Sequence, residues 1–138
     1  MPKTVTYLNP PSAPAPLGLY SNVAIAEAGR IAFIAGQVAV DEEGAIVAPH
    51  DVAAQTPVVL DNIGLILQDL GADFSDVLEF TTYIVGPESR EPWLKARTLA
   101  YEHHFPDGDY PANTLLIISG LARPELMVEV SAVVALPG

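Results

Sequence analysis

Two segments with the periodicity of amphipathic helices alternate with apolar, β-branched runs, and this alternation limits the possible folds more than any other feature. The strand-like runs cover residues 30–40, 45–47, 77–85, 114–119 and 126–136. The helical segments cover residues 51–70 and the stretch from Glu91 to the turn at 107–109. This order predicts an α+β fold, with two helices packed on one face of a mixed sheet, in one domain over residues 1–138.

The first helix has residues typical of helix ends. Asp51 is the expected N-cap and Gly71 the expected terminator. Its predicted inner face consists of Val52, Val59, Ile63, Ile66 and Leu70. Pro57 interrupts the pattern, because an interior proline removes a backbone hydrogen bond and costs about 3 kcal/mol. We expect a kink there, or a helix that is regular only after Thr56.

The other elements follow from similar signals. Pro92 suits the first position of the second helix, whose predicted inner face is Trp93, Ala96, Ala100 and His104. Residues 41–44 supply turn chemistry for a hairpin between the first two strands. Alternation within residues 31–38 puts Ala35 on one face and Gly36 on the other, so both faces should be covered. The proline-rich residues 9–16 should form an extended surface arm.

The composition favours an oligomer and argues against several classes of partner. Half of the residues are apolar and the mean hydropathy is +0.32, so we expect apolar surface to be buried between subunits. The net charge of −11 would repel nucleic acid. The chain has no cysteine, no cofactor-binding fingerprint, no apolar leader at its start and no membrane-spanning run. We therefore expect a cytoplasmic protein that needs no cofactor and binds neither nucleic acid nor membrane.

Glu129 stands alone in the otherwise apolar run 127–130. Burying an unpaired carboxylate is costly, so this residue should find hydrogen-bond partners, take up a proton, or line a site.

Several short motifs resemble those of the RidA/YjgF family. Leu19-Tyr20-Ser21 is similar to the family's Pro-Tyr-Ser, Ala35-Gly36-Gln37 to its Ser-Gly-Gln, and Pro111-Ala112-Asn113 to its Pro-Ala-Arg. Asp61-Asn62-Ile63 and Tyr101-Glu102 resemble parts of its two helices, and Glu129 matches a glutamate on its last strand. The resemblance covers nearly the whole chain and is specific when these motifs are taken together.

This resemblance implies a homotrimer with ligand clefts between its subunits, and hydrolysis of imines or enamines to carbonyl compounds and ammonia. It implies that Glu129 activates or positions water, and that Tyr20, Ala35, Gly36 and Asn113 contact the substrate. Asn113 stands where the family's arginine holds a carboxylate, and its neutral amide lacks the charged fork of that arginine. Ala35 likewise replaces a serine.

Three interpretations of Asn113 and Glu129 follow. In the first interpretation, the chain is an enzyme whose substrate differs from that of the family. It acts on a carbonyl, imine or enamine metabolite, with Glu129 as general acid or base. Alternatively, it is a non-catalytic metabolite-binding or regulatory protein that keeps the cleft. In the third interpretation, Glu129 is a hydrogen-bonded structural residue and Asn113 a turn residue.

Three other polar features could contribute to a site. Arg97 and Arg123 are two cations that could replace the missing arginine, although a surface arginine paired with Glu125 is the simpler interpretation of Arg123. His103-His104, followed by Asp107 and Asp109, is more typical of a solvated helix end than of a metal site, because adjacent helical residues point about 100° apart.

Overall fold

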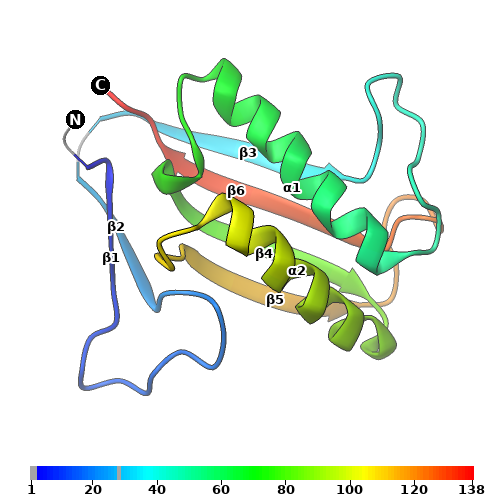
Figure 1. Cartoon of the computed structure of the whole chain (residues 1–138), viewed down its shortest axis with the longest axis horizontal. Helices are drawn as coiled ribbons and strands as arrows, with labels where there is room; N and C mark the ends of the chain where they lie inside the picture. Colours follow the sequence, from blue (N-terminus) through cyan, green and yellow to red (C-terminus); the bar gives the residue numbers. More distant parts are fainter. Residues whose placement is uncertain (1–2, 28) are drawn as a thin grey trace.

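The computed structural model describes residues 3–27 and 29–138, in which two helices lie across one face of a four-stranded sheet (Figure 1). Met1 and Pro2 lie outside the described residues. The strands in spatial order are β3 (Ile31–Val38), β6 (Val128–Ala135), β4 (Val77–Val85) and β5 (Ala112–Ile118). Because β4 and β5 are parallel and the other pairs antiparallel, the sheet is mixed, which confirms the predicted fold class.

The first helix, α1 (Val52–Asp69), begins as its sequence predicts. The Asp51 carboxylate accepts a hydrogen bond from the Ala54 N–H at 3.0 Å, and Gly71 follows the helix with a φ of +71°. Pro57 lies inside one helix that is already established from Val52, so the expectation of a regular helix only after Thr56 is wrong. Within the described residues, no helix combines the length and apolar character that crossing a membrane requires.

The second helix, α2 (Arg90–His104), follows the short 3₁₀ helix η2 (Pro87–Ser89) and presents a different face from the predicted one. Its buried residues are Trp93, Arg97 and Tyr101, whereas Ala96, Ala100 and His104 are only partly buried. The two large aromatic side chains, Trp93 and Tyr101, bury more apolar area than the alanines of the predicted face. The helix is therefore turned so that these aromatic side chains point inward. Arg97 is carried inward between them.

A hairpin of β1 (Val5–Leu8) and β2 (Val23–Ala26) lies beside the end of the main sheet (Figure 1). The sequence did not predict it, since four-residue strands give little periodicity. The proline-rich arm forms its loop and contains no regular element. The predicted strand at 45–47 contributes only a single bridge, between Val40 and Ile46.

The sheet face opposite the helices, called the open face below, carries apolar side chains that this chain does not cover. Phe33 is 80% exposed, and Ile31 and Leu116 are also exposed. This chain alone therefore does not supply the predicted cover for both faces of residues 31–38. A β-bulge between Ile34 and Gln37 also breaks the predicted alternation of side chains in β3.

Candidate functional site

Glu129 projects from β6 onto the open face. Its neighbours Val128 and Val130 are buried on the helix side, and Glu129 itself pairs with Val38 of β3 and Tyr83 of β4. Within residues 3–27 and 29–138, no hydrogen bond or ion pair engages its carboxylate. Contacts within one chain therefore do not support the interpretation of Glu129 as a hydrogen-bonded structural residue. The two carboxylate oxygens of Glu129 remain available on the open face.

The bulge in β3 places Gly36 directly against the Glu129 side chain. A Cβ atom at Gly36 would lie 2.6 Å from the Cδ of Glu129 and 2.9 Å from its Cγ, closer than carbon atoms pack. Gly36 therefore lies on the same face as Glu129, and the predicted assignment of Gly36 to the other face with Ile34 is wrong because the bulge changes the alternation. Ala35, next to it, is exposed.

We expect Gly36→Ala to displace the Glu129 side chain without unfolding the protein. The clash is with a flexible side chain, so the free energy of unfolding should fall by only about 1 kcal/mol, at the low end for an overpacked site. Any activity that depends on Glu129 should fall by at least about tenfold. Steady-state kinetics and thermal unfolding measure the two effects, with Gly120→Ala, whose Cβ would meet nothing within 4 Å, as the control. Unchanged kinetics would contradict the need for this close approach.

Asn113 lies on the helix side of the sheet, and the structure does not bring it to Glu129. It pairs with Phe80 in the parallel ladder, and its Oδ1 accepts a hydrogen bond from the buried Thr82 hydroxyl at 2.9 Å. Glu129 pairs with Tyr83, three residues or about 10 Å farther along β4. The two residues are therefore separated both along the strands and by the thickness of the sheet.

Tyr20 belongs to the same end of the molecule as Asn113. The Ser21 hydroxyl donates to the Tyr110 carbonyl at 2.6 Å, and the Ser21 N–H donates to the Pro111 carbonyl at 3.1 Å. The Tyr20 hydroxyl accepts a hydrogen bond from the Leu17 N–H at 3.1 Å, so the arm fixes its own tyrosine. The predicted residues thus form two groups: Tyr20 with Asn113, and Gly36 and Ala35 with Glu129.

Gln55 supports the second group, and the sequence analysis missed it. Its side chain is completely buried on the inner side of α1. Its Nε2 donates to the carbonyls of Ala48 and Glu125 at 3.0 and 2.9 Å, and its Oε1 accepts from the Met127 N–H at 2.8 Å. Gln55 therefore fixes the backbone two residues before Glu129. A glutamine between the apolar positions of a helix was the only signal in the sequence.

The two arginines differ in environment. Arg123 is exposed and lies 3.7 Å from Glu125, as the simpler interpretation predicted. Arg97 is buried, with its guanidinium carbon 4.9 Å from the centre of the Trp93 ring and 5.4 Å from that of Tyr101.

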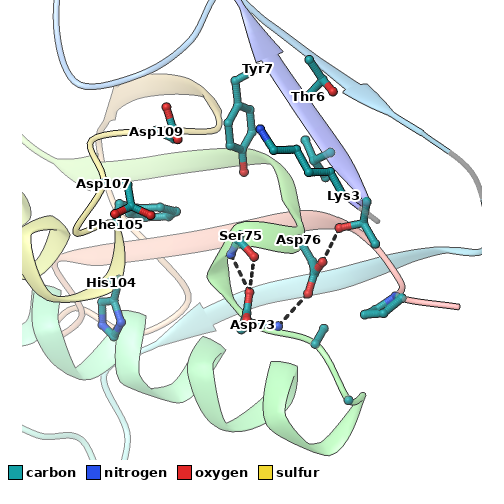
Figure 2. Close-up of a pocket in the computed structure, with 15 residues that line it drawn as sticks. Lys3, Thr6, Tyr7, Asp73, Ser75, Asp76, His104, Phe105, Asp107 and Asp109 are labelled. Carbon is teal, nitrogen blue, oxygen red and sulfur yellow. Dashed lines mark hydrogen bonds between the residues drawn. The ribbon is translucent and has the colours of Figure 1, made fainter. Parts of the chain in front are cut away.

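A cavity of about 580 Å³ lies elsewhere, between β1, the 3₁₀ helix η1 (Phe74–Asp76) and the end of α2 (Figure 2). The residues predicted to bind or convert the substrate do not line it, whereas His104, Asp107 and Asp109 from the end of α2 and the following turn do. Two of its acidic residues have structural partners: Asp76 accepts hydrogen bonds from Thr4 and from the Asp73 N–H, and Asp73 accepts from Ser75. These bonds close the turn of η1, and they account for two of the four carboxylates around the cavity.

The histidines at the end of α2 have a structural setting. The His104 ring stacks on Phe74, with centroids 4.0 Å apart, and its Nε2 lies 3.5 Å from an Asp61 oxygen. Burial lowers the pKa of His104, and His103 adds to this effect, against the opposing effect of Asp61. In the described part of the chain, no cluster of three or more histidine, aspartate or glutamate side chains is placed to hold a metal ion.

The chain is similar to known proteins over nearly its whole length. Residues 10–136 match the sequence model of the family described as endoribonuclease L-PSP. A RutC family protein of Pyrococcus abyssi is 30% identical over 88% of this chain and 89% of its own length. The 3-aminoacrylate deaminase RutC of Acinetobacter baylyi is 31% identical over 96% of this chain and 98% of its own length. The crystal structure of the Rid family protein YyfB from Yersinia pestis superposes with a TM-score of 0.86 at 29% identity, covering 96% of this chain and 99% of that protein.

Proposed function

Since this chain belongs to the RidA/YjgF family, we propose that it hydrolyses small imine or enamine metabolites to a carbonyl compound and ammonia, with Glu129 as the catalytic residue. The observation that carries this proposal is the Glu129 carboxylate, which has no partner among the described residues and lies against Gly36 on an otherwise largely apolar face. The relative named 3-aminoacrylate deaminase supports the reaction class, because 3-aminoacrylate is an enamine.

The proposed chemistry requires only a positioned water and proton transfers. An enamine first takes a proton on carbon and becomes an iminium ion, the protonated form of the imine. Water then adds to the C=N carbon, giving up a proton to the Glu129 carboxylate and forming a carbinolamine. Glu129 returns that proton to the nitrogen, the C–N bond breaks to release ammonia, and the hydroxyl gives up its proton as the C=O bond forms. The sum is one imine and one water consumed, and one carbonyl compound and one ammonia produced.

We further propose that the site is completed between subunits of a homotrimer. Asn113 and Glu129 are on opposite sides of the sheet within one chain, so a small ligand reaches both only if different copies supply them. The exposed Phe33, Ile31 and Leu116 on the open face support association, because an apolar face of this kind is usually covered by another subunit. Gly36 and Glu129 of one copy would then face Tyr20 and Asn113 of the next.

Phe33→Asp should dissociate the assembly. Placing a carboxylate at the most exposed aromatic position of the open face would force its desolvation in an apolar contact. Light scattering after size exclusion should change from about three chains to one. Leu65→Asp is the control, since Leu65 is 61% exposed on α1, on the other side of the sheet. A trimer that survives Phe33→Asp would place the subunit contact elsewhere.

The charge of the chain supports a small metabolite rather than RNA as substrate, despite the description of the family. A net charge of −11 opposes the phosphate contacts on which nucleic-acid binding depends. The second candidate is a non-catalytic protein that binds such metabolites in the same cleft, which the replacement of the family arginine by Asn113 favours.

The proposal is tested by ammonia release from imines generated in situ by an amino-acid oxidase, and from 3-aminoacrylate. We expect the wild-type protein to accelerate release above the spontaneous rate in proportion to its concentration. A rate equal to the spontaneous one with every substrate, together with saturable binding of the carbonyl product, would overturn the catalytic proposal in favour of the binding protein.

A further inference from the structure

The main sheet carries negative charge and no positive charge. The strands β3, β6, β4 and β5, all in the described part of the chain, contain no lysine or arginine, and their only charged residues are Glu79 and Glu129. Both lie on the open face, because each is followed by a residue that is buried on the helix side, Phe80 and Val130 respectively. A ligand on this face therefore meets two carboxylates.

The basic side chains of residues 3–27 and 29–138 lie away from Glu129. Five of the six belong to α2 on the other side of the sheet, to the start of β3 at the end remote from Glu129, or to the cavity beside η1. These five are Lys3, Arg30, Arg90, Lys95 and Arg97. The sixth, Arg123, lies 3.7 Å from Glu125. Within one chain, no cation is thus placed to hold an anionic ligand beside Glu129.

An aromatic side chain lies directly across from the Glu129 carboxylate. Tyr83 of β4 is the ladder partner of Glu129, and it alternates with the buried Thr82 and Ile84, so it also belongs to the open face. Side chains directly opposite each other in an antiparallel pair have their Cβ atoms about 5 Å apart. A carboxylate and an aromatic ring side by side are two groups that attract an organic cation.

We propose that the site prefers imines without a carboxylate and binds them as iminium cations, between Glu129 and Tyr83. This inference rests on the proposed function and names its substrate class: imines and enamines of simple amines rather than of amino acids. An iminium ion carries its positive charge on the C=N group that reacts. Attraction to Glu129 therefore places the electrophilic carbon beside the carboxylate that takes a proton from water. A ligand carboxylate is repelled by Glu129, so imines that carry one should react more slowly.

Three ligands of nearly the same shape test this proposal by calorimetry, without turnover. Benzamidine, benzamide and benzoate share a ring and a planar head group, which at neutral pH is a cation, a neutral amide and an anion. Benzamidine should bind at least about tenfold more tightly than benzamide, and benzoate should bind more weakly than benzamide. Glu129→Gln should bring the affinities for benzamidine and benzamide to within about twofold of each other, because it removes the charge that distinguishes them.

Two further variants locate the preference. Glu79→Gln is the matched control, since it removes the same charge from the same face four residues, or about 13 Å, along β4 from Tyr83. A charge at that distance is largely screened at physiological ionic strength, so the preference for benzamidine should fall by less than about threefold. Tyr83→Leu keeps an apolar side chain and removes the aromatic ring, and it should lower the preference by about threefold.

Three outcomes would overturn the proposal. The first is an absence of preference for benzamidine in the wild type, or a preference that Glu129→Gln leaves unchanged. The second is an equal loss in Glu79→Gln, since the preference would then come from the charge of the whole face. The third is tighter binding of benzoate, which would assign a cation from a neighbouring subunit to the site.

Ammonia release is measured separately from binding. A protein that prefers benzamidine through Glu129 and yet releases no ammonia would support this inference and overturn only the catalytic part of the proposed function. A protein that releases ammonia and binds benzoate most tightly would overturn this inference and leave the proposed function standing.

Discussion

Glu129→Gln should reduce ammonia release from imines by 10²-fold to 10⁴-fold, the range typical of removing a general base. The amide has nearly the shape of the carboxylate but cannot take a proton from water at neutral pH. Because Glu129 has no hydrogen bond or ion pair in the described part of the chain, its replacement removes no stabilising partner, and the melting temperature should change little. Steady-state kinetics should show the loss mainly in kcat.

Glu79→Gln is the matched control for this substitution. Glu79 is an exposed glutamate that alternates with Phe80 on β4, so it lies on the same open face as Glu129. Its replacement removes the same charge from that face without touching the proposed base. Equal losses in the two variants would mean that the negative charge of the face matters rather than proton transfer, and a fully active Glu129→Gln would exclude Glu129 as the catalytic residue.

The sequence predicted those elements whose pattern is carried by many residues. The strand at 77–85 agrees with β4 at both ends, and the capping by Asp51 is confirmed because an N-cap is a local interaction. The prediction of the inner face of α2 was wrong. An arginine counts as polar in any periodic pattern, although its side chain can be buried between aromatic rings. The sequence named Arg97 as a candidate cation, but its burial beside Trp93 and Tyr101 was found only through the structure.

The geometry of the site depended on features that a sequence pattern does not record. The motifs identified Gly36 and Glu129 separately, but their contact depends on a β-bulge that no alternation rule anticipates. The separation of Asn113 from Glu129 follows from the parallel register of β5 beside β4, which is set by tertiary pairing. Gln55 was missed for a related reason, because two of its three partners, Glu125 and Met127, lie about 70 residues away in the sequence.

Gln55→Ala should lower the free energy of unfolding by about 3 kcal/mol, at about 1 kcal/mol for each of three lost hydrogen bonds. The Ala48 and Glu125 carbonyls keep other donors, the N–H groups of Asp51 and His50. The Met127 N–H loses its bond to Oε1, so the damage should concentrate at the start of β6. Urea unfolding followed by circular dichroism measures the change.

The control and the functional readout together distinguish a support of the site from a general contributor to stability. Gln68→Ala changes the same residue type on the same helix where the side chain is exposed, and its free energy of unfolding should stay within about 0.5 kcal/mol of the wild type. Because Met127 precedes Glu129 by two residues, Gln55→Ala should also lower kcat at temperatures where the protein is still folded. A destabilised variant with unchanged kcat would show that Gln55 stabilises the fold but does not position the carboxylate.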